Sequence, residues 1–201
     1  MKQLFLIGLM LISLGACAQG EGYKVGDVVK DFALKNVDNK MVSMADYKDA
    51  KGFIVVFTCN TCPVAQAYQD RVAELNASYA AKGYPVIAIN PNDAGAVPAE
   101  SFDKMQALAK VKNFTYPYLL DPDHVVTKQF GASRTPHVFL VNKSDKGNVV
   151  EYIGAIDNDP EGENATKEDY VKNAINNLAT GKKPAVTTTK AVGCSIKWKK
   201  G

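Results

Sequence analysis

Residues 53–64 read FIVVFTCNTCPV and determine which fold the chain can adopt. The β-branched and aromatic run Phe53–Phe57 predicts a strand buried on both faces of a sheet. Pro63 suits the first turn of a helix, where its missing N–H is not needed. Apolar and small residues then recur at helical spacing over residues 64–81. The cysteine pair Cys59 and Cys62 is therefore expected where a strand passes into a helix.

This position favours redox chemistry. A thiolate there faces unpaired amide groups and the positive end of the helix dipole, and both lower the pKa of the thiol. Such a thiolate attacks disulfides, and a second thiol nearby can resolve the mixed disulfide. Two alternatives stay open, namely a purely structural cysteine pair and half of a metal site. A zinc site needs a second ligand pair, and the remaining candidates are widely separated in sequence: Cys17, His124, His137 and Cys194.

Length and composition indicate one globular domain. The 201 residues are 46% hydrophobic and 22% charged, which is sufficient for a core and ordinary for a globular chain. The net charge of +3 is uneven, because the segment from residue 182 onward holds six lysines and no acidic residue. No basic stripe with interleaved aromatic residues is present, so we expect no nucleic-acid partner.

The N-terminus has the pattern of a signal peptide over residues 1–18. Lys2 precedes the apolar run LFLIGLMLISL at residues 4–14, which is too short to span a bilayer. Leu-Gly-Ala-Cys at 14–17 matches a bacterial lipobox, which would make Cys17 a lipidated membrane anchor. The alternative is ordinary cleavage before Gln19. Either route predicts export, to a bacterial periplasm or the cell envelope, where disulfides can persist.

The rest of the chain alternates predicted strands and helices. Strands are expected at 84–90, 116–120, 137–142 and 149–153, helices at 63–82, 100–112, 124–130 and 166–180, and a hairpin at 32–44. Thr135-Pro136 directly before a buried strand indicates a cis peptide bond or the start of that strand. This order predicts an α/β domain over 19–181, with a mixed sheet covered by helices on both faces, and a basic tail at 182–201.

Strand–CNTCP–helix, followed much later by Thr135-Pro136, resembles the thioredoxin-like superfamily. The chain is most similar to its exported redoxin branch, related to the alkyl hydroperoxide reductase/thiol-specific antioxidant group. The resemblance covers residues 23–180 and implies a three-layer sandwich with an N-terminal hairpin extension and one inserted helix. It further implies that Cys59 is the exposed attacking thiol, Cys62 the buried resolving thiol, Pro136 a cis-proline against the disulfide, and Thr135 the backbone site for a substrate peptide.

Two departures from the family patterns bear on function. Thioredoxins carry a buried acid beneath the disulfide, whereas Phe53 stands at the matching position here. The peroxidatic pattern P-x-x-x-T-x-x-C is absent, because aligning its cysteine with Cys62 places Val55 and Cys59 at the proline and threonine positions. Aligning it with Cys59 gives Gly52 and Val56 instead.

We therefore expect an exported thiol–disulfide oxidoreductase that needs no cofactor beyond the Cys59–Cys62 disulfide. Its partners would be a disulfide-containing protein or a small thiol or disulfide, together with an unidentified electron donor or acceptor. A thiol peroxidase is the alternative, with a cysteine oxidised to sulfenic acid. A copper chaperone is a second alternative, with soft thiolates and His137 as ligands.

Two further residues, Cys194 and Arg134, have two possible roles each, and a third has one expected place. Cys194 could offer a third thiol to Cys59, or it could be a reduced or intermolecularly paired cysteine of a flexible tail. The apolar Val192, Ile196 and Trp198 beside it suggest that the tail docks. Arg134 would lower a thiol pKa if it faced the motif, and otherwise lies in solvent. His124 is expected on the surface at a helix start.

Overall fold

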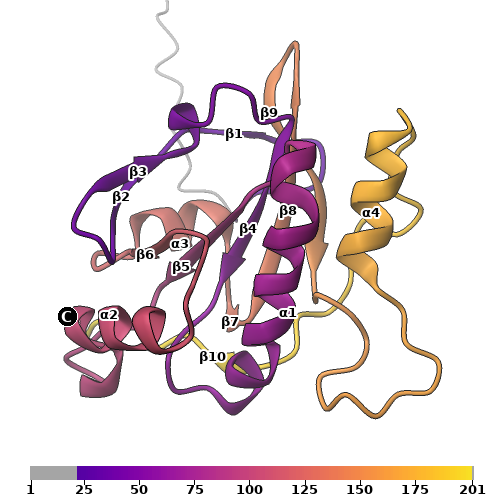
Figure 1. Cartoon of the computed structure of the whole chain (residues 1–201). Coiled ribbons are helices and arrows are strands. Elements are labelled where there is room, and N and C mark those ends of the chain that lie inside the picture. Colours follow the sequence, from indigo (N-terminus) through magenta and orange to yellow (C-terminus); the bar gives the residue numbers. More distant parts are fainter. Residues whose placement is uncertain (1–21, 201) are drawn as a thin grey trace, which may run out of the picture.

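The computed structural model describes residues 22–200. The predicted signal peptide and the lipidation of Cys17 lie outside the described residues. Within the described part of the chain, eight strands form one sheet in the order β1-β9-β8-β4-β5-β6-β2-β3 (Figure 1). The strands of this sheet are β1 (Val28–Val29), β2 (Ala33–Asn36), β3 (Met41–Ser43), β4 (Gly52–Phe57), β5 (Val86–Asn90), β6 (Tyr118–Leu120), β8 (His137–Ser144) and β9 (Gly147–Gly154).

Strand β4 lies in the middle of the sheet, where its six residues are all buried. It runs parallel to β5, and β5 runs parallel to β6, whereas β8 is antiparallel to β4 and β9 to β8. The predicted hairpin, β2 and β3, adds to the β6 edge, and β1 adds to the β9 edge. The sheet is therefore mixed, as the sequence predicts.

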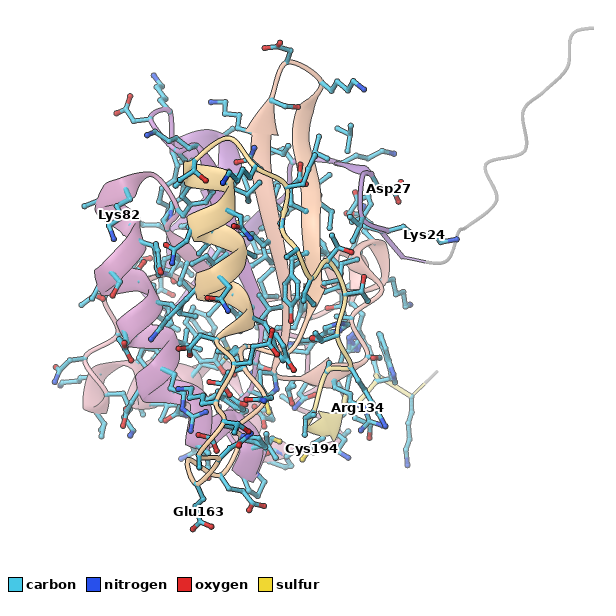
Figure 2. The ribbon with its side chains drawn as sticks, turned by 90° about the vertical axis from the view of Figure 1, so that its right-hand side faces the viewer. Lys24, Asp27, Lys82, Arg134, Glu163 and Cys194 are labelled. Atoms are coloured by element: carbon cyan, nitrogen blue, oxygen red, sulfur yellow. The ribbon has the colours of Figure 1, made fainter. Side chains whose placement is uncertain are left out.

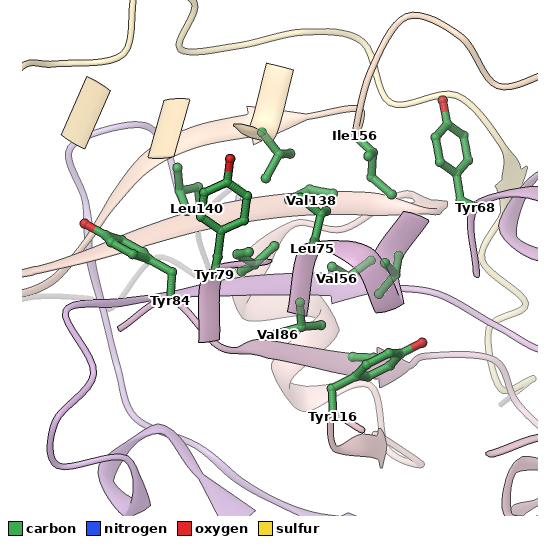
Figure 3. Packing of buried hydrophobic residues seen from close by; sticks show 14 of the residues in the cluster. Val56, Tyr68, Leu75, Tyr79, Tyr84, Val86, Tyr116, Val138, Leu140 and Ile156 are labelled. Carbon is green, nitrogen blue, oxygen red and sulfur yellow. The ribbon is translucent and has the colours of Figure 1, made fainter. Parts of the chain in front are cut away.

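Helices cover both faces of this sheet. They are α1 (Pro63–Tyr79), α2 (Phe102–Val111), α3 (Val125–Phe130) and α4 (Tyr170–Ala179), with short 3-10 helices η1 (Met44–Asp46), η2 (Ala80–Lys82) and η3 (Pro98–Glu100). Helices α1 and α4 pack on one face around Leu75 and Ile175, in the cluster shown in part in Figure 3. Helix α3 packs on the other face through Val126 and Phe130. The three-layer, thioredoxin-like sandwich is thus confirmed.

Two helix boundaries differ from the prediction. The last helix begins at Tyr170 rather than near Thr166, because the amide of Glu168 is bound by the side chain of Asn158 in the preceding loop. The inserted helix is interrupted, since η3 ends at Glu100 and α2 starts only at Phe102. None of the helices within residues 22–200 has the length and apolar character required to cross a bilayer.

A second, small ladder lies at the end of the sheet next to the start of α1. It pairs β7 (Arg134–Thr135) with β10 (Cys194–Ser195), a strand of the C-terminal tail (Figure 1). The tail reaches this place along β9, where the amide of Ile153 binds the carbonyl of Thr187 and the amide of Thr189 binds the carbonyl of Ile153. The basic tail is therefore docked on the domain.

Candidate redox site

The two cysteines of the motif lie at the predicted junction. Strand β4 ends at Phe57, and Cys62 is the residue immediately before α1, with Pro63 as the first helical residue. Both thiols are free, and Cys59 is 2% exposed and Cys62 3% exposed. The expectation that Cys59 would be an exposed thiol is therefore wrong for this structure, because Thr135, Glu100 of η3 and Cys194 of the tail pack against the motif.

Thr135 contacts both thiols. Its side-chain oxygen lies 3.1 Å from the sulfur of Cys59, and its carbonyl oxygen accepts a hydrogen bond of 3.2 Å from the thiol of Cys62. The peptide bond between Thr135 and Pro136 is cis. The structure thus brings together Cys59, Cys62, Thr135 and Pro136, the four residues at which the sequence predicts the site.

Glu100 is a residue of the candidate site that the sequence reasoning missed. Its carboxylate is fully buried beneath the CNTC turn. It accepts hydrogen bonds from the amide of Asn60 at 2.8 Å, from the amide of Thr61 at 3.0 Å and from the Thr61 hydroxyl at 2.5 Å. The side-chain amide of Asn90 donates a further bond of 3.0 Å. A buried acid therefore does lie under the motif, but it comes from η3 rather than from the position of Phe53.

Asn60 links the turn to its surroundings. Its side chain donates to the carbonyl of Ala99 at 2.9 Å and accepts from the hydroxyl of Tyr118 at 2.9 Å. Its own carbonyl accepts from the side chain of Gln66 at 2.7 Å. The turn that carries the two cysteines is consequently fixed on both sides by hydrogen bonds.

The two thiols ionise differently. Burial raises the pKa of Cys59 to about 11, and the negative charge of Glu100 acts in the same direction. Burial also raises the pKa of Cys62, but hydrogen bonds from the Cys194 thiol and from the amides of Ala65, Cys194 and Val64 outweigh it, so the Cys62 pKa is lowered. The helix start at Cys62 supplies two of these amides, as the sequence predicts for a thiol at this junction. Only the Cys62 thiol is therefore stabilised as a thiolate.

Cys194 is half-buried and faces Cys62 rather than Cys59. Its amide donates to the Cys62 sulfur at 3.3 Å, and its thiol pKa is raised by its hydrogen bond to Cys62 and by burial. In Figure 2 the labelled Cys194 and Arg134 lie at the same end of the molecule. Arg134 donates to the carbonyl of Gly193 at 2.8 Å, so it binds the tail instead of facing the motif.

The two histidines are buried, and their hydrogen bonds are to backbone amides rather than to cysteine sulfur atoms. His137 accepts the amide of Ser133 at 3.4 Å, and burial lowers its pKa to about 4. His124, expected on the surface, is instead buried against Trp198, with ring centroids 5.0 Å apart. Among residues 22–200, no three potential metal ligands converge, so the set Cys59, Cys62 and His137 is not assembled as a metal site.

Comparison with known proteins identifies the class to which this fold and site belong. The AhpC/TSA family matches residues 25–152, so the chain belongs to the AhpC/TSA family. Thiol-disulfide oxidoreductase ResA of Geobacillus thermodenitrificans is 25% identical over 122 residues, which are 61% of this chain and 66% of ResA, slightly less than two thirds of its length.

Solved structures show the same fold. A hypothetical protein from Sinorhizobium meliloti is 30% identical with a TM-score of 0.82, over 90% of this chain and 97% of that one. The exposed lipoprotein thioredoxin Etrx1 of Streptococcus pneumoniae is 21% identical with a TM-score of 0.51, over 62% of this chain and 87% of that one. The first likeness spans most of the chain, whereas the second shows the thioredoxin-like fold alone. The resemblance inferred from the sequence is confirmed.

Proposed function

We propose that this AhpC/TSA-family protein is a thiol–disulfide oxidoreductase whose redox pair is Cys59 and Cys62. The observation that carries the proposal is the geometry at Thr135, which contacts both thiols at 3.1 and 3.2 Å. Redox chemistry is the function that the family and the relative ResA have in common with this site. The missing peroxidatic pattern weighs against a thiol peroxidase.

The electrostatics favour a division of roles opposite to the one that the family resemblance implies. Cys62 has the lowered pKa, and Cys59 has a pKa of about 11. Because the thiolate is the attacking species, we assign the attack to Cys62 and the resolving step to Cys59. The carbonyl of Thr135 favours protonated Cys62, so this contact must lengthen when the thiolate forms.

The reaction proceeds in two exchanges. The Cys62 thiolate attacks one sulfur of a substrate disulfide, forming a mixed disulfide and releasing the first substrate thiolate, which takes a proton. Cys59 then loses its proton and attacks the Cys62 sulfur, releasing the second substrate thiolate and leaving a Cys59–Cys62 disulfide. The substrate gains two electrons and the enzyme loses two. An electron donor of the thiol class returns the enzyme to its reduced form.

The compartment and partners are part of the same proposal. The signal-peptide pattern of residues 1–18 supports export, with lipidated Cys17 as the membrane anchor. A disulfide-bonded protein substrate is supported by the pairing of β7 with β10 beside the thiols, because this edge accepts an extended chain.

Trapping mixed disulfides tests the assignment. Purified Cys59→Ser and Cys62→Ser proteins, each carrying Cys194→Ser so that the tail thiol cannot resolve an adduct, would be mixed with insulin beside the wild type and separated without reductant. We expect insulin adducts on Cys59→Ser, which keeps the attacking thiol, and none on Cys62→Ser. Adducts on Cys62→Ser alone would restore Cys59 as the nucleophile. A parallel arm with hydrogen peroxide tests the alternative, since oxidation of Cys62 by peroxide much faster than by insulin would make the protein a peroxidase.

A further inference from the structure

The C-terminal tail holds a defined position over the redox site. Residues Cys194 and Ser195 pair antiparallel with Thr135 and Arg134, the strand immediately before the cis-proline. The amide of Cys194 also donates to the sulfur of Cys62. The same short segment thus pairs with the edge of β7 and contacts the sulfur of Cys62.

Contacts on the C-terminal side anchor this segment. Ile196 is 4% exposed and packs in the core cluster around α3. The backbone of Lys197 forms two hydrogen bonds with the loop after β5. Its amide donates to the side-chain oxygen of Asn92 at 2.9 Å, and its carbonyl accepts from the amide of Asp93 at 2.8 Å. The amide of Lys199 donates to His124 at 2.9 Å. The position of Cys194 is therefore determined by contacts on both sides.

We propose that Cys194 is a third redox thiol which exchanges with Cys62, and that strand β10 occupies the edge of β7 at which a substrate polypeptide pairs. This inference rests on the proposed oxidoreductase function and adds an occupant to its substrate site. The tail is in effect an intramolecular substrate, because it offers an extended backbone to β7 and a sulfur atom to Cys62. A protein substrate reaches Cys62 only when β10 has left.

The exchange needs no outside oxidant or reductant once the enzyme is oxidised. Cys194 loses its proton and its sulfur attacks Cys62 in the Cys59–Cys62 disulfide. The bond between Cys62 and Cys59 breaks, a bond between Cys62 and Cys194 forms, and Cys59 takes up a proton. The new disulfide fixes β10 on β7, so it closes the edge until the electron donor reduces it.

A substitution at Gly193 can test whether β10 occupies the edge of β7 without changing any cysteine. A Cβ atom at this residue would lie 2.0 Å from the carbonyl oxygen of Thr135 and 3.1 Å from the nitrogen of Pro136, and the φ of Gly193 is +150°. Alanine at this position is therefore excluded while the tail is docked. Lys190→Ala is the matched control, because Lys190 is an exposed residue of the same tail.

The experiment combines disulfide mapping with two substrates. Each protein is oxidised with insulin, digested without reductant, and its disulfide-linked peptides are identified by mass spectrometry. Rates of reduction are then measured for insulin, which needs the edge, and for 5,5′-dithiobis(2-nitrobenzoate), which does not. We expect a Cys62–Cys194 disulfide in the wild type and in Lys190→Ala, and its loss in Cys194→Ser and Gly193→Ala. Gly193→Ala should also reduce insulin about tenfold faster, as expected when an internal competitor is released, and this increase should exceed that for the small disulfide, which needs Cys62 uncovered but does not need the edge of β7.

Two results would overturn the proposal. One is that Cys59–Cys62 is the sole internal disulfide in every protein, and the other is that insulin reduction is the same in Gly193→Ala and wild type while the small disulfide is reduced normally. Failure of the proposed oxidoreductase function gives a different result, because no variant would then reduce either insulin or the small disulfide. In that case oxidation with diamide in place of insulin still determines whether Cys62 pairs with Cys194.

Discussion

The buried carboxylate of Glu100 accepts the backbone amide of Asn60 at 2.8 Å, so a residue of η3 fixes the turn between the two cysteines. The same carboxylate binds Thr61 through its amide and its hydroxyl. Hydrogen bonds to a charged acceptor are stronger than neutral ones. The turn is thus held by a charge that also disfavours ionisation of Cys59.

Glu100→Gln should loosen the turn and ease ionisation of Cys59. The glutamine amide group is a donor, so at least one of the donors that now face the carboxylate loses its partner. We expect the free energy of unfolding to fall by about 2 kcal/mol and the pKa of Cys59 to fall below about 11. Denaturant titration and thiolate absorbance at 240 nm measure the two effects. Asp49→Asn, in the exposed turn after η1, is the control and should change neither.

Thr135→Val removes the effect of the Thr135 hydroxyl on Cys59 and keeps the effect of the Thr135 carbonyl on Cys62. Valine has nearly the same shape but no hydroxyl, so Cys59 loses a hydrogen bond that lowers its pKa, while the carbonyl that faces Cys62 stays. We expect the pKa of Cys59 to rise and that of Cys62 to change little. Thiolate absorbance of a Cys62→Ser, Cys194→Ser background, with and without Thr135→Val, isolates Cys59. An unchanged titration would show that the hydroxyl does not act on this thiol.

The parts of the site that the sequence predicted are those with local signals. A buried strand, a CxxC and a proline lie within residues 53–64, and the helix start that follows needs only Pro63 and periodic apolar residues. The junction and the amides that stabilise Cys62 follow from these signals. The fold follows in the same way, because alternating strands and helices with short connections leave few arrangements of the sheet.

The missed parts depend on contacts between distant residues. Glu100 meets Asn60 across 40 positions, and nothing around Glu100 in the sequence marks it as buried. The amide of Cys194 meets Cys62 across 132 positions. The apolar Ile196 and Trp198 within a basic tail were a valid sign of docking, but a sign of this kind does not tell where the tail docks. The surface assignment of His124 was wrong for the same reason, since Trp198 covers it.

Asp157 should be a main source of stability on the α1 face. Its side chain is 1% exposed and accepts from the Tyr68 hydroxyl at 2.6 Å and from Arg71 at 3.0 Å. Asp157→Asn removes a buried charge that pairs with half-buried Arg71, so we expect a loss of about 3 kcal/mol in the free energy of unfolding. Lys172→Gln breaks the more exposed pair with Glu74 and should cost less than about 1 kcal/mol. Equal losses in the two variants would contradict this assignment.

The pH dependence of stability should reveal the buried His137. Its Nδ1 accepts the amide of Ser133, and burial lowers its pKa from 6.5 to about 4. As the pH falls below 6.5, the unfolded chain binds a proton that the folded protein does not bind, so stability is lost until about pH 4. This interval corresponds to roughly 3 kcal/mol in total, of which about 2 kcal/mol is lost by pH 5. Urea titrations at pH 7 and pH 5 should show this decrease in the wild type and a smaller one in His137→Gln.

Buried His124, whose pKa is lowered by burial, shifts stability in the same direction, so some decrease remains in the His137→Gln variant. Equal decreases in wild type and His137→Gln would mean that His137 binds its proton at an ordinary pH in the folded protein.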